Sequence, residues 1–473
     1  MRYRFLTLLA VTLLASCALA EDWPQWFGPK RDGVWRETGL LEKFPATGLP
    51  IRWRTPIRGG YAGPAVAAGR VYVTDFILKP NVDRPTNPYK HISQPGMERV
   101  LCLDESTGAI LWTYEYEVDY TLSYSAGPRT TPAVDGERVY TLGAEGELIC
   151  LATKDGKKIW SRHLATEQSP TPNWGFAGHP LVDGDKLICL TGGNDPDHGH
   201  GVITAFNKKN GDILWTALAA KEPGYAPPLL IEAGGTRQLI VWDPVALTSL
   251  DPETGKTHWS EPFGPARMGG TIMTPRFYAD PQFGNVLLVS TQYEGMAVFK
   301  LDEKEPKASI LWKRAGKSDR KTEALHILMC SPVIRDGHIY GIDIMGEFRC
   351  LNLKNGDRLW STTDFTTGDA GPQKWSTAFV IPLGDTGRRY LIPNEHGDLI
   401  LADLDPEGYH EISRAHVLKP TNNDAQRPVV WCFPALANRC IYWRNDKEII
   451  CASMAAEGGE LKNQKLEIRK KSE

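Results

Sequence analysis

The stretch Cys102-Leu103-Asp104-Glu105-Ser106-Thr107-Gly108-Ala109-Ile110-Leu111-Trp112 contains a short apolar segment, a polar turn with a glycine, and a second apolar segment that reaches a tryptophan. This order is typical of two antiparallel strands joined by a tight turn. The pattern returns at 150–160, 206–215, 250–259 and 350–360, and Ile310-Leu311-Trp312 keeps only its ending. Because self-similarity at a regular spacing indicates a repeat architecture, we expect one repeated unit to build most of the chain.

A second series of positions gives the number of units. Each unit opens on a small residue, a proline and an apolar strand, with alanine replacing the proline once; the positions are Pro64, Pro132, Pro180, Pro228, Pro275, Pro332, Ala378 and Pro434. Most units continue through a polar turn such as Asp135-Gly136 into a strand such as Arg138-Val139-Tyr140. Eight units of four short strands predict an all-β fold, namely an eight-bladed β-propeller of four-stranded antiparallel blades.

One tryptophan opens the outermost strand of nearly every unit, at Trp53, Trp112, Trp160, Trp215, Trp259, Trp312 and Trp360. These positions are on average about 51 residues apart. An aromatic residue at one fixed position in successive blades indicates packing between neighbouring blades, and we prefer this interpretation to stacking on a planar cofactor.

The last unit lacks its outermost strand. Strands are expected near 429–436, 439–444 and 448–453, and no tryptophan strand follows them. At the other end of the chain, Ile51-Arg52-Trp53-Arg54-Thr55 has the character of the missing strand. We therefore predict that the N-terminal strand completes blade 8 and closes a propeller of residues 51–455, which leaves no long unpaired sheet edge.

The first twenty residues have the pattern of a secretory signal peptide. Arg2 and Arg4 precede a short apolar core, and Ala18-Leu19-Ala20 is typical of a cleavage site, so we expect residues 1–20 to be removed. An alternative is a lipobox at Leu14-Ala15-Ser16-Cys17, which would make Cys17 a lipid anchor. Either interpretation predicts an exported protein, periplasmic or extracellular.

The remaining segments and the overall composition narrow the class of protein. A Trp-rich arm is expected at 21–50, and a polar, basic tail at 456–473. The net charge of −3 offers no electrostatic basis for binding nucleic acid. No later stretch approaches 18 consecutive apolar residues, so no membrane span is predicted.

The Asp-x-x-Thr-Gly-x-x-x-Trp pattern of the repeat resembles the tryptophan-docked propellers of the PQQ (pyrroloquinoline quinone) repeat superfamily, over residues 51–455. Asp22-Trp23-Pro24-Gln25-Trp26-Phe27-Gly28-Pro29, with Arg31 and Gly33, is similar to the opening of exported bacterial PQQ-like proteins. This superfamily includes quinoprotein dehydrogenases and non-catalytic propellers such as the lipoprotein of the outer-membrane barrel assembly machinery. The resemblance thus implies the fold and leaves the function open.

Loop lengths predict which face of the propeller binds a ligand. In a four-stranded meander, the loops before the first strand and between the second and third strands share one face. The long segments 76–97, 115–128, 165–176, 192–201, 361–374 and 418–428 all belong to these loops. Long loops on a rigid scaffold carry binding residues. We therefore predict a ligand-binding ring at the channel mouth, formed by the residues that precede the first strands: Tyr61, Arg129, Trp174, Tyr225, Arg267, His326, Lys374 and Trp431.

This ring mixes cations with aromatic rings and has few carboxylates, so it favours an anionic or planar ligand. The alternative is a water-filled channel lined by structural side chains. Asp195, Asp197, His198 and His200 share one Gly-rich loop that has both the composition of a metal site and that of a solvated connection. We assign no metal ligands and no catalytic residues.

The cysteines are expected to be buried thiols. Cys102, Cys150, Cys350 and Cys451 occupy the same strand position in four blades, too far apart around the ring to form disulfides. Cys432 and Cys440 stand on facing strands, where a bridge is an open alternative.

Two functions follow from the resemblance. A quinoprotein dehydrogenase that oxidises alcohols or sugars would need PQQ, Ca²⁺ and a carboxylate base, and in that branch of the superfamily an adjacent Cys-Cys pair covers the cofactor. This sequence has no Cys-Cys pair and no clear carboxylate set among the strand starts. The sequence therefore favours a non-catalytic binding or scaffold propeller of the bacterial cell envelope, without a cofactor, whose partner is a protein, peptide or glycan.

Overall fold

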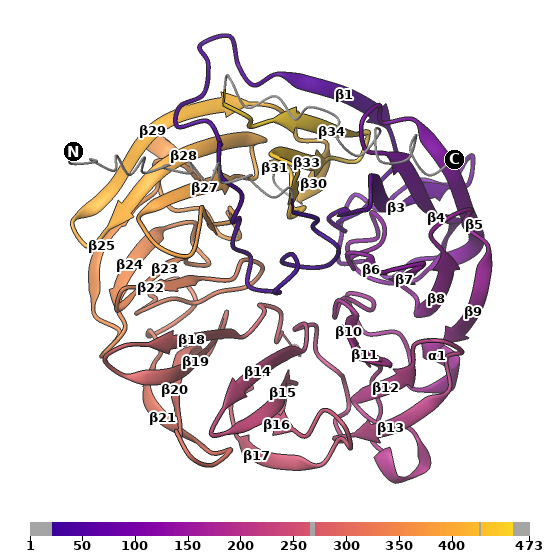
Figure 1. Ribbon diagram of the computed structural model, residues 1–473, viewed down its shortest axis with the longest axis horizontal. Helices are drawn as coiled ribbons and strands as arrows, with labels where there is room; N and C mark the ends of the chain where they lie inside the picture. Colours follow the sequence, from indigo (N-terminus) through magenta and orange to yellow (C-terminus); the bar gives the residue numbers. More distant parts are fainter. Residues whose placement is uncertain (1–20, 265–269, 425–426, 457–473) are drawn as a thin grey trace, which may run out of the picture.

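The computed structural model describes residues 21–264, 270–424 and 427–456. These residues form eight four-stranded antiparallel sheets around a central channel (Figure 1). In seven sheets the four strands follow one another along the chain. The predicted all-β, eight-bladed propeller is confirmed. The signal peptide and Cys17 lie outside the described residues, as does all of the C-terminal tail except Ala456.

Blades 1 to 4 run from Ala65 to Glu261. Their strands are β2 (Ala65–Ala67), β3 (Arg70–Leu78), β4 (Gln94–Asp104), β5 (Ile110–Tyr120), β6 (Ala133–Asp135), β7 (Arg138–Leu142), β8 (Glu147–Ala152), β9 (Lys158–His163), β10 (Leu181–Asp183), β11 (Lys186–Leu190), β12 (Ile203–Asn207), β13 (Ile213–Ala217), β14 (Leu229–Ala233), β15 (Thr236–Trp242), β16 (Leu247–Leu250) and β17 (Thr257–Glu261). A short helix, α1 (Leu164–Glu167), and a 3₁₀ turn (Pro196–His198) interrupt the connections.

Blades 5 to 8 complete the ring. Their strands are β18 (Arg276–Asp280), β19 (Gly284–Thr291), β20 (Gly295–Leu301), β21 (Ala308–Arg314), β22 (Val333–Arg335), β23 (His338–Ile342), β24 (Phe348–Asn352), β25 (Arg358–Thr362), β26 (Ile381–Pro382), β27 (Arg389–Pro393), β28 (Asp398–Asp405), β29 (Gly408–His416), β32 (Ala435–Ala437), β33 (Cys440–Arg444), β34 (Glu448–Ser453) and β1 (Ile51–Pro56). A hairpin of β30 (Asn422–Asp424) and β31 (Arg427–Val429) and a 3₁₀ turn (Gly368–Ala370) lie between blades.

The N-terminal strand closes the ring as predicted. β1 pairs antiparallel with β34, and Trp53 lies opposite Cys451 in the register. Blade 8 therefore has the strand order β32-β33-β34-β1, with its outermost strand supplied by the start of the chain (Figure 1). This pairing covers the edge of β34, which would otherwise be exposed.

Five of the seven repeated tryptophans contact a glycine turn of the next blade, namely Trp53, Trp112, Trp160, Trp215 and Trp312. The Trp112 ring of blade 1 packs over Gly156 of blade 2, where a Cβ atom would come within 2.6 Å of the indole. The Trp112 indole N–H also donates to the Thr153 carbonyl at 3.0 Å. Gly156 has φ +73°, which favours glycine as well. The repeated Gly and Trp are thus the two halves of one interblade contact.

The arm, residues 21–50, crosses the channel on one face of the propeller (Figure 1). Trp23 forms a backbone bridge with Val66 of blade 1, and Val134 of blade 2 donates to the Pro24 carbonyl at 2.8 Å. The buried Arg31 guanidinium donates to the Pro180 carbonyl at 3.0 Å, and burial lowers its pKa to about 9. The arm therefore connects several blades through the middle of the ring.

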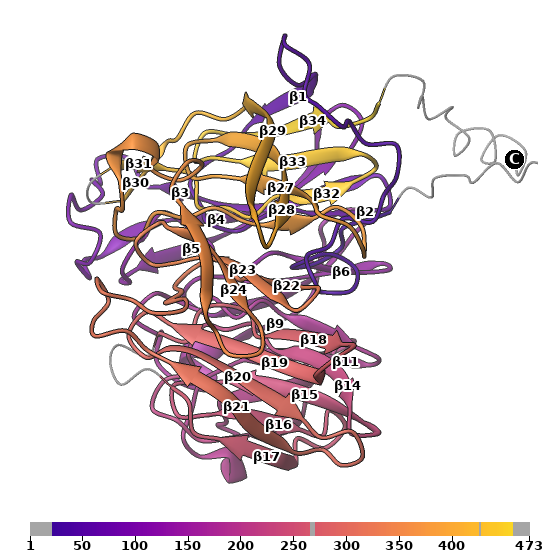
Figure 2. The ribbon, with the colours of Figure 1, turned by 90° about the vertical axis from the view of Figure 1, so that its left-hand side faces the viewer.

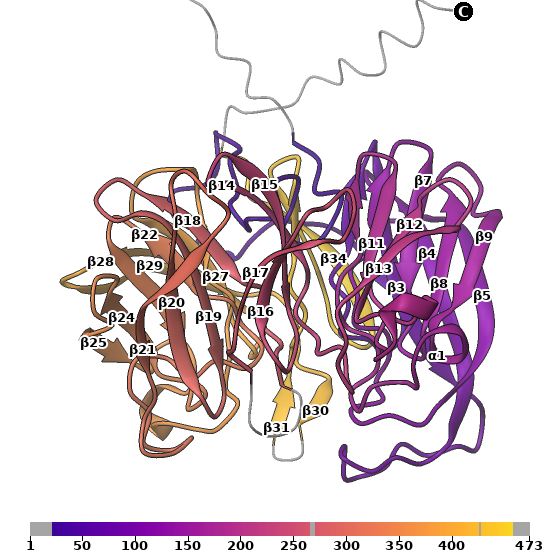
Figure 3. The same cartoon turned by 90° about the horizontal axis from the view of Figure 1, so that it is seen from below.

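The long connections project from the face opposite the arm. In the side views, the β30–β31 hairpin lies at one face and the arm at the other (Figures 2 and 3). Among the described residues, no helix is long and apolar enough to cross a membrane.

All eight cysteines in the described part of the chain are buried and carry free thiols. Cys432 and Cys440 are therefore not bridged. The Cys432 thiol donates to the Gly60 carbonyl at 3.3 Å. Cys440 contacts Cys451 instead, and the hydrogen bond between the two lowers the pKa of the Cys440 thiol. The expected separation of Cys102, Cys150, Cys350 and Cys451 into different blades is confirmed, since they lie on β4, β8, β24 and β34.

Candidate functional site: an aromatic pocket at one end of the channel

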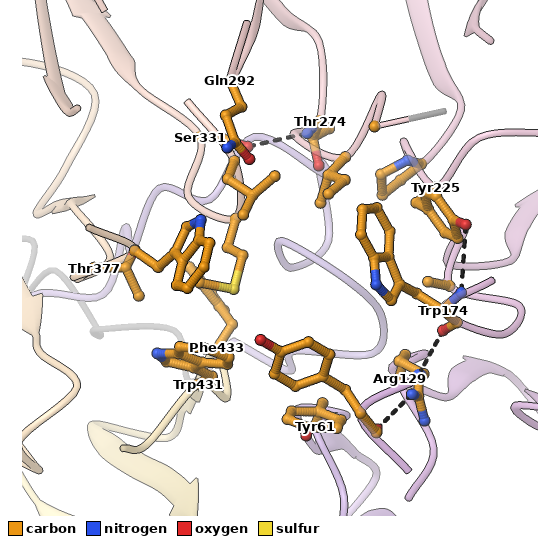
Figure 4. A pocket seen from close by; sticks show the side chains of 18 of the residues that line it. Tyr61, Arg129, Trp174, Tyr225, Thr274, Gln292, Ser331, Thr377, Trp431 and Phe433 are labelled. Carbon is orange, nitrogen blue, oxygen red and sulfur yellow. Dashed lines mark hydrogen bonds between the residues drawn. The ribbon is translucent and has the colours of Figure 1, made fainter. Parts of the chain in front are cut away.

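A pocket of about 550 Å³ opens where the long loops surround the channel. Most of its wall comes from the connections that precede the first strand of each blade, and the rest from the loops after β3 and β19. Aromatic side chains dominate the wall: Tyr61, Tyr89, Tyr124, Trp174, Tyr225, Tyr293, Trp375 and Trp431. Figure 4 shows Trp174 and Tyr225 on the opposite side of the opening from Trp431.

The arm forms the floor of this pocket. The Trp26 ring stacks on His179 with 3.8 Å between centroids, and the Trp26 indole N–H donates to the Thr274 hydroxyl at 2.9 Å. Phe433 packs on the other side of Trp26, at 5.3 Å. Burial and the nearby Arg31 guanidinium hold the pKa of His179 well below its usual range, so its ring is neutral. The floor is therefore uncharged and aromatic.

Five of the eight residues predicted from the sequence meet in this pocket: Tyr61, Arg129, Trp174, Tyr225 and Trp431. The Arg129 guanidinium, however, faces backbone carbonyls. It donates to the carbonyls of Trp174 at 2.8 Å, Ser123 at 2.8 Å and Tyr124 at 2.6 Å, and also to that of Gly127. Burial lowers the pKa of Arg129. The guanidinium thus holds these loops together through hydrogen bonds, and it lies over the Tyr61 ring.

Two of the other three predicted residues, His326 and Lys374, do not line the pocket. His326 is fully buried; its Nδ1–H donates to the Gln292 carbonyl at 2.9 Å, and its Nε2 accepts from the Gly316 amide at 2.9 Å. Lys374 forms an ion pair with Asp319. Arg267 lies outside the described residues. Among the residues described, the predicted cations thus do not form a ring around the opening. A histidine in this position supports a loop, a role that a sequence pattern does not distinguish from binding.

Sequence reasoning missed Tyr89, Tyr124 and Trp375, which contribute to one aromatic cluster. The Tyr89 ring lies 5.3 Å from Tyr124 and 6.4 Å from Trp375, and Tyr124 lies 6.0 Å from Trp431. Tyr124 and Trp375 adopt left-handed backbone conformations, with φ of 54° and 67°. Such a conformation is costly for a bulky residue and persists where the surroundings enforce it, often at functional sites. Only their places in long loops, beside predicted positions, pointed to them.

A buried ion pair positions one wall of the pocket. Glu395 is fully buried and accepts from Arg427 at 3.0 and 3.1 Å, from the Trp431 indole N–H at 3.0 Å, and from the Ser376 hydroxyl at 2.6 Å. Separating a buried ion pair is unfavourable, because each member would become an uncompensated charge. Glu395 therefore holds the β30–β31 hairpin and the Trp431 ring in place.

Two buried side-chain polar atoms of the described lining residues have no hydrogen-bond partner within the described part of the chain, the Trp174 indole nitrogen and the Thr377 hydroxyl oxygen. The Trp174 ring packs against Tyr225, 5.1 Å away, and its side chain points into the opening (Figure 4). A buried donor without a partner is unfavourable and calls for a ligand acceptor or a water molecule.

The pocket does not fit a calcium–quinone centre. Ca²⁺ takes six to eight oxygen ligands, among them carboxylates. None of the described residues that line the pocket carries a carboxylate. Over residues 21–264, 270–424 and 427–456 there is also no group of three or more His, Cys, Asp or Glu side chains that could hold a metal ion. In the Gly-rich loop, Asp195 pairs with His198 at 2.9 Å. The described lining residues thus lack the donors that such a centre requires.

Comparison with known proteins places the chain among both branches of the superfamily. Outer membrane protein assembly factor BamB of Yersinia pestis is 23% identical over 57% of this chain and 62% of its own length. Quinohemoprotein alcohol dehydrogenase ADH IIB of Pseudomonas putida is 30% identical over 33% of this chain. The match spans only 24% of that dehydrogenase, so it does not assign the activity.

Solved structures give the same two neighbours at the level of the fold. BamB from Moraxella catarrhalis has a TM-score of 0.53 at 15% identity, covering 87% of this chain and 99% of its own. Quinohemoprotein alcohol dehydrogenase from Comamonas testosteroni has a TM-score of 0.59 at 14% identity, covering 92% and 81%. The family model described as outer membrane protein assembly factor BamB matches residues 96–362, more than half of the chain. With its eight four-stranded blades, the chain therefore belongs to this family of PQQ-like β-propellers.

Proposed function

We propose that this protein is a non-catalytic binding propeller of the bacterial cell envelope, and that its long-loop face holds a partner in the aromatic pocket. The observation that carries the proposal is the pocket itself: about 550 Å³, walled by tyrosine and tryptophan, and closed at its floor by Trp26. Pockets of this size with mostly apolar walls and a few polar groups are typical binding sites. The family is that of an assembly factor, which supports a protein-binding role.

The charges around the pocket favour a neutral ligand. Arg129 is directed to carbonyls, Lys374 is paired with Asp319, and Arg427 is paired with Glu395. An anionic ligand would have to compete with these contacts. We therefore propose a neutral ligand in place of the anionic ligand that the sequence favours. Tyr61, Trp174, Tyr225 and Trp431 remain the proposed ligand contacts, with Arg129 holding the loops that carry them.

A quinoprotein dehydrogenase is the alternative, because the relatives also include quinohemoprotein alcohol dehydrogenases. Proton abstraction from an alcohol needs a base within hydrogen-bond reach of the substrate. The described lining residues provide no carboxylate, and His179 is buried beneath Trp26 with Nδ1 accepting from the Thr131 amide at 2.8 Å. The chemistry of the pocket thus supports binding over oxidation. Export to the periplasm or beyond it remains part of the proposal, with a lipid anchor at Cys17 as the alternative to cleavage after Ala20.

Site-specific photo-crosslinking in the producing cells tests this function. A photoreactive phenylalanine analogue replaces Tyr89, which is 39% exposed at the pocket mouth, and in a matched variant it replaces the exposed Lys43 of the arm. We expect a discrete adduct from position 89 that is lost when Trp174 and Trp431 are also changed to alanine. Equal adducts from both positions would contradict the proposal, as would dye-linked alcohol oxidation after reconstitution with PQQ and Ca²⁺.

A further inference from the structure

The chemistry of the pocket wall distinguishes between classes of neutral ligand. Besides the aromatic rings, the wall contains Ile272, Leu328 and Met329, together with Phe379 and Phe433 near the floor. Sugars present hydroxyl groups in every direction, and buried hydroxyls need hydrogen-bond partners. An aliphatic and aromatic interior offers few of these, so it suits an apolar group that enters completely.

The residue types match a protein-recognition surface. Tyrosine, tryptophan, phenylalanine, methionine and arginine are enriched at protein interfaces. The residues that dominate binding energy are often aromatic and sit in well-packed pockets from which water is excluded. The tyrosine-rich rim, with Tyr61, Tyr89 and Tyr124 beside Met329, has this composition.

The unpartnered Trp174 donor adds a directional requirement. An apolar side chain alone would leave the Trp174 indole N–H without an acceptor. A peptide segment brings a backbone carbonyl on either side of each side chain, so it can fill the apolar interior and accept this hydrogen bond at the same time. A hydrocarbon or a lipid chain would satisfy only the first requirement.

We infer that the pocket receives a bulky, uncharged side chain, such as leucine, phenylalanine or tryptophan, from an extended or looped segment of a partner protein, with a partner carbonyl accepting from the Trp174 Nε1–H. This inference rests on the proposed function and names the class of its ligand. The floor built by Trp26 makes the pocket a dead end, so the segment inserts a side chain and does not thread the channel. A basic side chain is disfavoured because the described lining residues carry no carboxylate. An acidic side chain is disfavoured because it would have to compete for the Arg129 guanidinium with four backbone carbonyls.

Titration with capped five-residue peptides tests this inference. Each peptide has a central leucine, phenylalanine, tryptophan, alanine, aspartate or lysine between glycines, and methyl glucoside serves as the saccharide probe. We expect the bulky apolar peptides to bind at least about tenfold more tightly than the alanine peptide, by thermal shift and ligand-observed NMR. Equal affinity for the aspartate or lysine peptide would overturn the inference.

A matched pair of conservative variants isolates the hydrogen bond. Trp174→Phe keeps an aromatic ring and removes the unpartnered donor, whereas Trp215→Phe removes an equally unpartnered indole donor in the interblade ladder, outside the pocket. We expect Trp174→Phe to weaken the leucine peptide about tenfold and Trp215→Phe to leave its affinity unchanged. Equal effects of the two variants would contradict the assigned hydrogen bond.

The outcomes also separate this inference from the proposed function. Binding of methyl glucoside in place of the peptides, lost in the Trp174→Ala variant, would overturn the peptide assignment and leave the binding function standing. Alcohol oxidation with PQQ and Ca²⁺ would overturn both.

Discussion

The two ends of the central channel are both lined by aromatic residues, but they differ in whether their polar atoms have hydrogen-bond partners. At the arm end, Arg31 donates to the Pro180 carbonyl at 3.0 Å, and the Trp35 indole N–H donates to Glu37 at 2.8 Å. At the long-loop end, the Trp174 indole N–H has no partner within the described residues. Trp35 is completely buried, whereas Tyr89 at the pocket mouth is 39% exposed.

This difference indicates which end stabilises the ring and which end is available to a partner. Satisfied polar groups and complete burial stabilise the folded state, and they leave nothing for a ligand to gain. An exposed aromatic rim around an unsatisfied donor is costly in the absence of a ligand. The arm end thus stabilises the ring, and the long-loop end is the one at which we propose that a partner binds.

Removal of the arm together with β1 should have the largest effect on stability. Deletion of residues 21–58 takes away the arm and β1, so the edge of β34 and the floor of the pocket are both exposed. We expect aggregation or loss of a single cooperative unfolding transition, because an unpaired strand edge pairs with other chains. Circular dichroism melting and light scattering measure this. An unchanged melting curve would contradict the closure of the ring through β1.

The interblade contact should respond to a single added methyl group. Gly156→Ala places a Cβ 2.6 Å from the Trp112 indole at φ +73°, and we expect it to lower the free energy of unfolding by about 3 kcal/mol. Gly136→Ala is the matched control, since Gly136 has φ +57° and nothing within 4 Å of its Cβ position. It should cost only the backbone term, about 1 kcal/mol. Equal losses in chemical denaturation would show that the Trp–Gly contact does not stabilise the ring.

A buried carboxyl between blades 1 and 2 predicts a pH dependence of stability. Glu98 on β4 accepts from the hydroxyls of Tyr116 at 2.6 Å and Tyr120 at 2.5 Å, and burial raises its pKa to about 7. Because the folded state holds this proton more tightly than the unfolded chain does, stability from Glu98 is present below about pH 4.5 and is lost as the pH rises to about 7. The whole change is about 3 kcal/mol.

Glu98→Gln should reduce this slope and leave the part that comes from Glu147, whose pKa burial also raises to about 7. Glu117→Gln, an exposed position of the same hairpin, should retain the whole slope. Denaturation at a series of pH values measures both variants. A slope that is unchanged in Glu98→Gln would show that Glu98 does not contribute to it.

The smallest effect on stability is expected at the long-loop end. Trp375 has φ +67°, so Trp375→Gly should be more stable than Trp375→Ala by about 1 kcal/mol, because only glycine adopts this conformation without strain. Both variants lack the ring and should lose binding of the leucine peptide equally. Equal stabilities would show that the backbone there is not strained, and retained binding would remove Trp375 from the site.

The fold was predictable from the sequence because its determinants are local and repeated. The glycine and tryptophan seen at Gly108 and Trp112 recur at a regular spacing in other units. The eighth unit lacks its outermost strand, and Ile51–Thr55 has the character of that strand. The floor of the pocket was not predictable, because Trp26 meets His179 only after the ring has closed, across more than 150 residues of sequence.

The site was predictable in position and not in chemistry. Counting back from each strand start found Tyr61, Trp174, Tyr225 and Trp431, since the blades present these positions to the channel. Loop lengths vary, so in blade 7 the pocket residue is Trp375, one place after the predicted Lys374. The partners of Arg129 are backbone carbonyls, which no side-chain pattern in the sequence records.

Fluorine NMR of the protein labelled with 5-fluorotryptophan tests the central claim most directly, because it observes both ends of the channel in one experiment. Each resonance is assigned by replacing its tryptophan, and the capped leucine peptide is then titrated. The account predicts that the resonances of Trp174, Trp375 and Trp431 shift, while that of Trp35, which is completely buried and is not among the described lining residues, stays in place. A shift at Trp35 with none at the pocket tryptophans would contradict the assignment of the long-loop end as the binding end.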